Sequence, residues 1–472
     1  MKPLAPLAAT LLLSACAIGP DYRPATTPAV ATGGFQSAMP ATATSAATPD
    51  AWWRLFKDPV LDDLIVEAFA ANTDLRVANA NLRRARAVLS ESRSGRLPTT
   101  TISGSAVESR QTVPTVNGPV PFETAFYRLG LDASYEIDLY GRVTRSIEAA
   151  RADAAAEAAQ RDTVAISVAA ETARAYADAC SAARQLAVAE RSLKLQADSF
   201  DLTERRVAAG RDSPLDAARA RAQLESTRAS LPGFAASRRS ALFRLAVLTG
   251  KPPTEADPRA AACTAPPLLG QPIPAGDGMA LLKRRPDIRA ADRTLAAATA
   301  RIGVATADLF PRVSLGGSVT GQGVTPGAAF SNNGFGFSLG PLISWSFPNI
   351  LVARARIRQA EAGAEAALAG FDGTVLAALQ ETETALSDYA GTIDRNKALR
   401  AARDQSAEAA RIVRLRYSAG AESFLAVLDA ERTLATADAS LAESDAALTT
   451  SQIAVFKALG GGWASAPALA AN

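Results

Sequence analysis

One pattern of secondary structure occurs twice in this sequence, at an offset of about 210 residues. Each copy reads as a helix, two strands, a very long helix, a tight turn and a return helix. Three pairs of short segments carry the match: 72–76 with 285–289, 97–98 with 310–311, and 206–210 with 416–420. A strand pair flanked by helices this long is rare in a soluble enzyme, whereas a membrane duct would use both.

The repeat also predicts how the chain is divided. A signal peptide and a tether precede the first copy, a Pro-rich linker separates the copies, and a tail follows the second. We expect a signal peptide at 1–15, a lipidated tether at 16–50, a first repeat at 51–252, a linker at 253–279, a second repeat at 280–463 and a flexible tail at 464–472.

The charge balance and the absence of histidine narrow the function classes. The chain has 50 basic and 47 acidic side chains and a net charge of +3, so its charge gives no reason to expect a nucleic-acid partner. It has no histidine, which is the commonest metal ligand and general base. Ser-His-Asp, Cys-His and His-rich zinc sites are therefore excluded, and we expect no enzyme activity, metal site or cofactor.

The N-terminus predicts a lipoprotein signal. Lys2 precedes an apolar stretch centred on 11–13 that is too short to span a bilayer as a mature helix. The following Leu-Ser-Ala-Cys, which ends at Cys16, resembles the bacterial lipobox, in which the cysteine after the cleavage site becomes lipidated. An ordinary signal with a chance cysteine is the alternative. Several acyl chains on Cys16 would anchor the chain stably, and Ala17, in place of an aspartate, resembles the outer-membrane default.

The two remaining cysteines could form a disulfide, because the expected compartment permits one. Cys180 lies on a predicted long helix and Cys263 lies in the linker. Two unpaired packing cysteines are the alternative, and the sequence leaves both possibilities open.

Alternation of apolar and polar residues predicts two strands in each repeat. From 127 to 139 the apolar face carries aromatic residues and the other face carries charges. Residues 313–320 and 335–347 repeat this register, and 99–109 is a weaker counterpart. The pattern is typical of a lipid-facing barrel strand with an aqueous lumen. An antiparallel sheet over a soluble core is the alternative, but the lipoprotein signal and the strand length favour the barrel.

Four strands cannot close a barrel alone, and open sheet edges are forbidden in lipid. We therefore expect the sheet to close between subunits. Two subunits would give eight strands and an interior filled by side chains, whereas three would give twelve strands and a lumen. The sequence thus favours a homotrimer.

The helices are unusually long. Residues 142–211 contain no proline and predict a helix of about 70 residues, or roughly 105 Å. An opening helix is expected over 59–96 and a return helix over 214–250, with a kink at 231–232. The second copy predicts 353–418 against 286–309 plus 423–459. Apolar residues at heptad spacing predict close packing between neighbours, so we expect a tube wall of antiparallel helices.

These features together resemble the outer-membrane efflux protein family, and more narrowly its lipoprotein branch, which is typified by OprM and NodT and related to TolC. The resemblance covers nearly all of the mature chain and is carried by segments 135–142, 284–289, 301–305, 416–432 and 458–463. It implies an α+β membrane protein, a trimer whose twelve-stranded barrel in the outer membrane continues into an α-helical periplasmic barrel. It also implies a passive exit duct for drugs or other toxic solutes. Such ducts dock onto a periplasmic adaptor protein and an inner-membrane pump, usually of the resistance-nodulation-division class.

The two predicted turns both read Arg-x-x-Ala-Gly. A helix–turn–helix corner would account for the glycine, but by helix length the turns lie about 100 Å from the strands, where a partner would dock. We therefore expect adaptor contacts at Arg206, Val207, Gly210, Tyr417, Ser418 and Gly420.

A gate is expected just past the second turn. Leu425 and Asp429 lie on one helix face and match positions that form an apolar ring and an acidic ring at the periplasmic entrance of OprM-like ducts. A coiled-coil leucine and a solvated aspartate are the alternative. The first repeat has Arg219 where the second has Asp429, so Arg219, Arg416 and Arg432 are candidate ion-pair partners that hold the gate shut.

One competing hypothesis comes from another class of protein: a lipid-anchored periplasmic coiled-coil adaptor or scaffold whose strands form a soluble domain. The aromatic and aliphatic strand faces, repeated in register, argue against it. An enzyme is a remote third possibility, because no triad, metal cluster or phosphate loop is visible.

Overall fold

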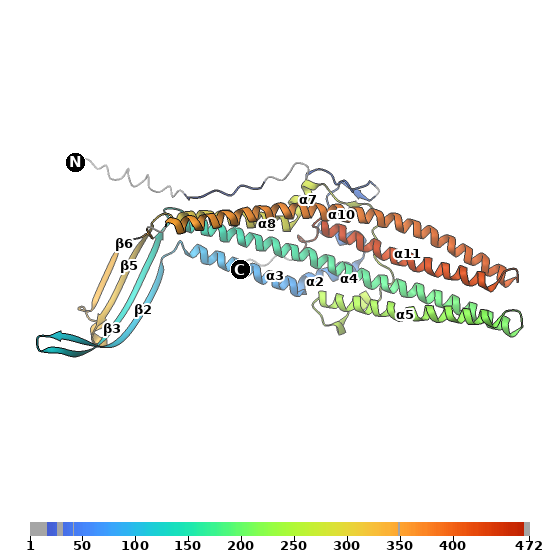
Figure 1. Ribbon diagram of the computed structural model, residues 1–472, viewed down its shortest axis with the longest axis horizontal. Helices are drawn as coiled ribbons and strands as arrows, with labels where there is room; N and C mark the ends of the chain where they lie inside the picture. Colours follow the sequence, from blue (N-terminus) through green and yellow to red (C-terminus); the bar gives the residue numbers. More distant parts are fainter. Residues whose placement is uncertain (1–16, 26–31, 41, 348–349, 467–472) are drawn as a thin grey trace. The chain divides into compact units, whose positions relative to one another are not determined.

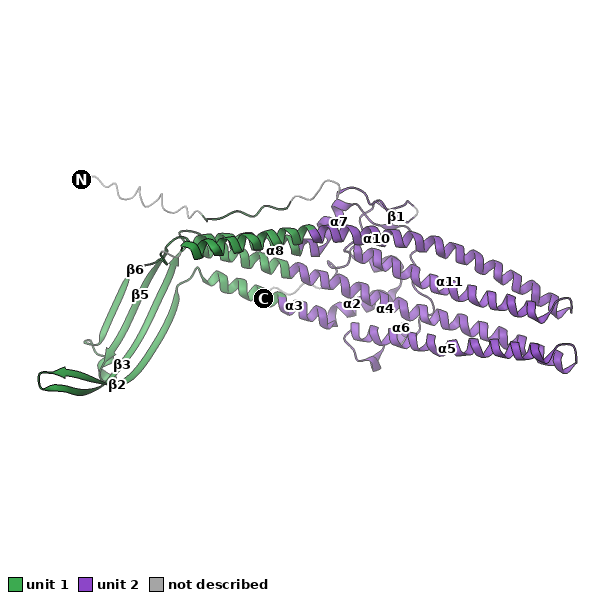
Figure 2. Ribbon diagram, in the orientation of Figure 1, with its two compact units in different colours: residues 1–25, 82–157, 290–372 green, residues 26–81, 158–289, 373–472 purple. Residues whose placement is uncertain are grey.

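The chain forms two compact units, each of which draws on both sequence repeats (Figure 2). The computed structural model describes residues 17–25, 32–40, 42–347 and 350–466, so the expected lipidation site, Cys16, lies outside the described residues. Unit 1 comprises 1–25, 82–157 and 290–372, and unit 2 comprises 26–81, 158–289 and 373–472.

Unit 1 contains a four-stranded antiparallel sheet in the order β2-β3-β5-β6 (Figure 1). The strands are β2 (Thr99–Thr115), β3 (Gly118–Ile137), β5 (Arg312–Gly323) and β6 (Phe335–Ser344). Pairing of β3 with β5 joins the two repeats, and β2 and β6 are the free edges.

The apolar faces of the strands align across the whole sheet. Leu131 of β3 lies opposite Ile102 of β2 and Val319 of β5, and Val319 lies opposite Phe337 of β6. Residues 328–329 lie over Gly321 and Gly323 of β5 on this face. Most of the rest of the face is uncovered within the described part of the chain, and Phe337 is 77% exposed. The sheet therefore has an apolar surface without a core of its own.

The first strand pair is longer than expected. β2 has 17 residues and β3 has 20, whereas alternation predicted strands only over 99–109 and 127–139. The two strands meet at a two-residue turn, Val116–Asn117, followed by Gly118 at φ 106°. Prolines near the turn obscured the strand pattern, since proline lacks the N–H that a ladder needs. In the second copy β6 ends at Ser344, before the last aromatic residues of the expected apolar face.

The long helices lie close to their expected bounds. They are α4 (Arg142–Ala208), α5 (Pro214–Leu248), α8 (Pro286–Ala307), α10 (Ile350–Ser418) and α11 (Phe424–Ala458). Local signals start them: Asp138 accepts hydrogen bonds from the N–H groups of Val143 and Thr144, and Ser213 caps α5 ahead of a proline. Among the described helices, α10 contains a window long and apolar enough to cross a membrane by composition alone, and only 17% of that window is buried.

The expected single opening helix is wrong, because the chain breaks at Asn72 into α2 (Pro59–Ala71) and α3 (Thr73–Ser94). Asn72 is extended, with ψ 133°, and its side chain accepts hydrogen bonds from the N–H groups of Asp74 and Leu75. Its amide also donates to the carbonyl of Leu248, so the break is fixed by a tertiary contact.

Shorter elements are η2 (Trp52–Phe56), η3 (Pro253–Glu255), α6 (Pro258–Ala261), α7 (Gly278–Arg284), α9 (Pro326–Ala329) and the parallel strands β1 (Ala43–Thr44) and β4 (Ile273–Pro274).

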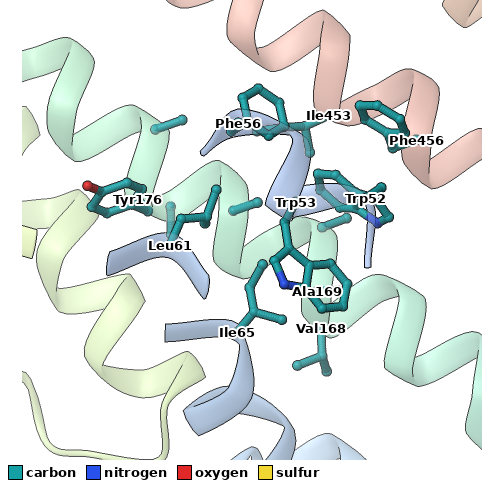
Figure 3. Close-up of a cluster of buried hydrophobic side chains, with 14 of the residues drawn as sticks. Trp52, Trp53, Phe56, Leu61, Ile65, Val168, Ala169, Tyr176, Ile453 and Phe456 are labelled. Atoms are coloured by element: carbon teal, nitrogen blue, oxygen red, sulfur yellow. The ribbon is translucent and has the colours of Figure 1, made fainter. Parts of the chain in front are cut away.

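Unit 2 contains the main hydrophobic core (Figure 3). The Trp52 ring stacks on Phe456 of α11 with their centroids 4.9 Å apart, and Trp53 lies edge-on to Trp52. Side chains of η2, α2, α4 and α11 complete the cluster: Phe56, Leu61, Ile65, Val168, Ala169, Tyr176 and Ile453. The aromatic segment after the expected tether therefore packs between helices of the two repeats.

A disulfide joins Cys180 of α4 to Cys263 in the segment that follows α6. It connects the long helix of the first repeat to the segment between the repeats, across 83 residues of sequence. The N-terminal segment is also bound to unit 2, because Glu383 of α10 accepts the backbone N–H groups of Gln36 and Ser37, both at 2.8 Å.

Candidate functional site

The two helix–turn–helix corners of unit 2 have the same backbone. In the first, the N–H of Gly210 donates to the carbonyl of Val207 at 2.9 Å, and the next N–H donates to Arg206 at 2.8 Å. In the second, Gly420 and its successor donate to Tyr417 and Arg416 at the same two distances. Both glycines have positive φ, 68° and 76°, as this type of helix C-cap requires. The Arg-x-x-Ala-Gly pattern is therefore the sequence signal of a Schellman turn.

One carboxylate connects the two corners. Arg206 Nε lies 2.9 Å from Asp212 Oδ2, and the Tyr417 hydroxyl donates to the same oxygen at 2.5 Å. The Arg206 guanidinium also lies over the Tyr417 ring, 4.3 Å from its centroid, and donates to the Tyr417 carbonyl at 3.3 Å. The two corners, which are about 210 residues apart in sequence, are thus joined by a cation–π contact and a shared acceptor.

Burial and these bonds shift the pKa values of Asp212 and Tyr417 in opposite directions. Desolvation, the largest effect, pushes the pKa of Asp212 upwards, but hydrogen bonds from Arg206 and Tyr417 outweigh it and lower the pKa below the usual value. Desolvation, together with the bond to Asp212, raises the pKa of Tyr417 to about 12. At neutral pH the aspartate is therefore ionised and the tyrosine keeps the proton that it donates.

The structure divides the six residues expected to contact an adaptor. Gly210, Ser418 and Gly420 are exposed, and Val207 is half-buried. Tyr417 is only 3% exposed, and Arg206 is half-buried in its ion pair. The Tyr417 side chain is therefore not presented to a partner, and with Arg206 it holds the corner together.

A small apolar cluster lies behind the corners. Its buried members are Ala220, Tyr417, Phe424, Val427 and Leu428, with Phe200 and Val413 packed against them. A pocket of about 630 Å³ adjoins this cluster between α4, α10 and α11, and its lining includes Leu195, Leu202, Leu415, Tyr417, Phe424 and Val427.

Glu431 of α11 is a buried carboxylate that sequence reasoning missed. It accepts a hydrogen bond from Ser199 of α4 at 2.7 Å and forms an ion pair with Arg414 of α10 at 2.9 Å. Burial is the main effect on it and raises its pKa, although Ser199 and Arg414 act in the opposite direction. A signal was present, because Glu431 continues the buried helical stripe of Phe424, Val427 and Leu428.

The expected gate residues point away from this cluster. Leu425 is 56% exposed and Asp429 is exposed, although both lie between buried positions of α11. The candidate arginines are exposed too. Within the described residues, the structure pairs Arg219 with Asp216 at 3.9 Å and Arg416 with Glu422 at 3.6 Å. It pairs neither with Asp429, so no gate lock forms inside one copy of the chain.

Segments 284–289 and 458–463, which carried the family resemblance, have structural contacts in unit 2. Arg284 donates to the carbonyls of Thr48 and Pro49 at 2.6 and 3.2 Å. Arg285 bonds to Asp287, Glu381 and the carbonyl of Ala458. Over the parts of the chain that the structure describes, no group of three or more metal-ligating side chains comes together.

Comparison with known proteins agrees with this arrangement. Residues 64–251 and 279–461 match the family model described as outer membrane efflux protein. Nodulation protein T of Rhizobium leguminosarum bv. trifolii is 31% identical over 433 residues, which cover 91% of this chain and 91% of that protein. Outer membrane protein OprJ of Pseudomonas aeruginosa is 30% identical, over 96% of this chain and 94% of its own length. The solved structure of the outer-membrane channel OprN matches with a TM-score of 0.87 at 38% identity, covering 95% of this chain and 100% of that one.

Proposed function

Since this chain belongs to the outer membrane efflux protein family, we propose that three copies form one exit duct through the outer membrane. Members of the family are outer-membrane channels of efflux pumps and not enzymes. The proposal adds the assembly, the anchor, the gate and the partners. It treats 1–15 as a signal peptide, 16–50 as the lipidated tether, 51–252 and 280–463 as the repeats, 253–279 as the linker and 464–472 as the tail.

The free edges of the sheet are the observation that carries the trimer. β2 and β6 each leave one edge unpaired within the chain, and one face of the sheet is apolar and exposed. In lipid an unpaired backbone edge costs several kcal/mol for each unsatisfied group, so β6 of one copy must pair with β2 of the next. Two copies would give eight strands, whose interior side chains fill. Three copies would give twelve strands, which leave a lumen. The polar face, with Asp132 and Glu136, would line it.

Exposed apolar positions on the helices support a wall that is shared between copies. Leu351, Leu376 and Leu415 of α10 are all more than half exposed in a single chain. A helix whose apolar side chains are uncovered is normally buried by a neighbour. We assign this face to contacts between copies in a periplasmic tube, with Cys16 lipidated in the outer membrane.

The exposure of the second-repeat positions supports the gate. Leu425 and Asp429 face away from the cluster behind the corners, so in a trimer three copies of each could converge. Three carboxylates close together repel one another unless cations pair with them. Arg219, Arg416 and Arg432 are exposed and would supply those cations from neighbouring copies.

The partners that we propose are a periplasmic adaptor and an inner-membrane pump. We propose a pump of the resistance-nodulation-division class, as the family resemblance implies. The exposed corner residues Gly210, Ser418 and Gly420, with half-buried Val207, form the adaptor surface. The neighbouring pocket, which has apolar and charged lining residues, extends this surface. The alternative of a lipid-anchored scaffold leaves the exposed apolar sheet face unexplained.

Conductance of single purified trimers in planar bilayers tests the duct and the gate together. The resting trimer should conduct weakly, and the double variant Leu425→Ala with Asp429→Ala should conduct at least about tenfold more, because both rings are removed. Leu215→Ala changes the position of the first repeat that corresponds to Leu425 and is the matched control. It should give a smaller increase.

Two results would contradict the proposal in different ways. If neither form conducts although trimers insert, the duct is wrong. If the trimer conducts fully at rest and the double variant changes nothing, the duct stands and the gate at Leu425 and Asp429 is wrong.

A further inference from the structure

Residues 17–22, which we call the strap, lie against α4 and α8 in unit 1. The N–H of Ile18 donates to the carbonyl of Tyr140 at 3.4 Å. Tyr140 itself stacks on Phe310, with 4.5 Å between ring centroids. The strap immediately follows Cys16 in the sequence, so it is the first segment after the expected lipid attachment point.

A buried arginine binds the strap by its backbone. Arg145 of α4 is only 4% exposed. Its guanidinium donates to the carbonyls of Ile18 and Gly19, both at 3.3 Å, and to the Asp21 carboxylate at 2.7 Å. Its remaining partners are the carbonyl of Ala17, at 3.5 Å, and Glu148, at 2.8 Å on the same helix. Without the strap, most of the donors of this guanidinium would lose their acceptors, which is costly for a buried charge.

Three glycines make room for this contact. A Cβ on Gly141 would lie 2.6 Å from the Cα of Ala17, and a Cβ on Gly303 of α8 would lie 2.9 Å from the carbonyl oxygen of Ile18. Gly19 of the strap has φ 99°, and its Cβ would lie 2.5 Å from the Cα of Gly303. These separations are far below any normal contact, so the surface is shaped to receive a backbone with no side chain between.

The far end of the strap is also bound to α8. The Tyr22 hydroxyl donates to Asp292, and the Arg293 guanidinium lies 5.8 Å from the centre of the Tyr22 ring. Desolvation and the bond to Asp292 raise the pKa of Tyr22, so its hydroxyl remains a donor at neutral pH.

The contact explains two segments that the gate and the corners do not use. Gly141 belongs to segment 135–142 and Gly303 to segment 301–305, both of which carried the family resemblance. Gly141 comes from the first repeat and lies between β3 and α4, whereas Gly303 comes from the second repeat and lies in the part of α8 that leads to β5. The surface that holds the strap is therefore complete only when α4 and α8 lie together.

We propose that Gly141, Arg145, Asp292 and Gly303 form a peptide-binding seat whose ligand is the strap of the same chain. Occupation of the seat staples the two repeats together beside the sheet and fixes Ala17, the residue bonded to Cys16, at that place. The lipid-anchoring part of this inference rests on the proposed function, whereas the seat itself rests on the contacts within unit 1.

A nitroxide spin label on the residue that directly follows the strap tests the seat in the full-length trimer. Arg23 is exposed beside the strap, so Arg23→Cys can carry the label, and Cys180 and Cys263 are occupied by their disulfide. The parent spectrum should show slow motion. Arg145→Met, Gly303→Leu and Gly19→Ala should each raise the mobile fraction at least about tenfold, since each removes bonds or forces a clash. Gly34→Ala is the control, because a Cβ there meets nothing within 4 Å.

Mass spectrometry of the same samples separates the two parts of the inference. One label per chain with an acylated N-terminal peptide supports lipid anchoring, and two labels per chain reject it without affecting the seat. Folded Arg145→Met and Gly303→Leu trimers with the parent spectrum would overturn the seat. If those two variants do not assemble, Gly19→Ala decides alone, because it alters only the strap: a parent-like spectrum for it overturns the seat.

Discussion

The two corners of unit 2 share a backbone and an ion pair but differ in how their charges are buried. Arg206 and Asp212 of the first corner lie 2.9 Å apart with side chains 21% and 10% exposed. Their counterparts in the second, Arg416 and Glu422, lie 3.6 Å apart with side chains 60% and 29% exposed. The ion pair is thus short and largely buried in the first corner. In the second corner, which we call the open corner, the ion pair is longer and more exposed.

Two unmatched positions accompany the difference. Tyr417 of the second corner reaches across to Asp212, whereas the corresponding residue of the first corner is Val207, which has no donor for Glu422. The return helices differ as well, because α11 begins with buried Phe424 and α5 begins with exposed Pro214. Duplication therefore copied the turn, while the second repeat supplies the apolar contacts and the first supplies the buried charge.

The largest expected effect is the loss of Asp212. Asp212→Asn should lower the free energy of local opening at the ends of α4 and α10 by about 3 kcal/mol, because it leaves half-buried Arg206 without its carboxylate. Hydrogen exchange of the backbone amides near Arg206 and Tyr417 measures this opening. Unchanged protection at both segments would show that the shared carboxylate does not hold the corners.

The next effect should be asymmetric within the Arg414–Glu431 pair. Arg414→Met leaves a buried carboxylate with only Ser199 and should cost about 2 kcal/mol. Glu431→Gln removes the charge that is costly to bury, keeps a partner for Ser199, and should cost less than about 1 kcal/mol. Exchange of amides around Ser199 and Glu431 compares the two variants. Equal costs would mean that burial of the charge is unimportant there.

Acidification should change the local stability at Asp212 and at Glu431 in opposite directions. The folded pKa of Asp212 is lowered, so its stabilisation is complete above the ordinary value of 3.8 and is lost as the pH falls through the folded value below it. The folded pKa of Glu431 is raised above 4.5, so its site gains stability as the pH falls through that raised value. Exchange rates corrected for intrinsic pH dependence should show both trends, and Asp212→Asn should abolish the first alone.

The smallest effect is expected at the open corner. Glu422→Gln breaks the exposed pair with Arg416 and should change local opening by less than about 0.5 kcal/mol. It is the matched control for Asp212→Asn, since the two residues occupy corresponding positions. A cost as large as that of Asp212→Asn would remove the distinction between the corners.

Introduction of a tyrosine tests why the corners differ. Val207→Tyr places a hydroxyl at the position that corresponds to Tyr417 and should leave local opening at the second corner within about 0.5 kcal/mol of the parent, since Glu422 stays solvated. A clear gain in protection near Arg416 would show that the missing donor alone keeps this corner open.

Local signals in the sequence were enough to locate most elements and the kind of protein. Pro214 after Ser213 starts a helix, Gly210 ends one, and alternation over 127–139 predicts a strand with one apolar face, because each depends on a few adjacent residues. The same logic missed the first part of β3, where prolines interrupt the alternation, and the break at Asn72, which the Leu248 carbonyl fixes from another helix.

The sequence alone determined the duplication, the long helices, the alternating strands and the positions of the turns, since these are set by spacing along the chain. Only the tertiary structure decided that Tyr417 donates a hydrogen bond to Asp212, that buried Glu431 pairs with Arg414, and that Arg145 binds the strap. These contacts join residues from distant segments, and their energy comes from burial, which no local pattern contains.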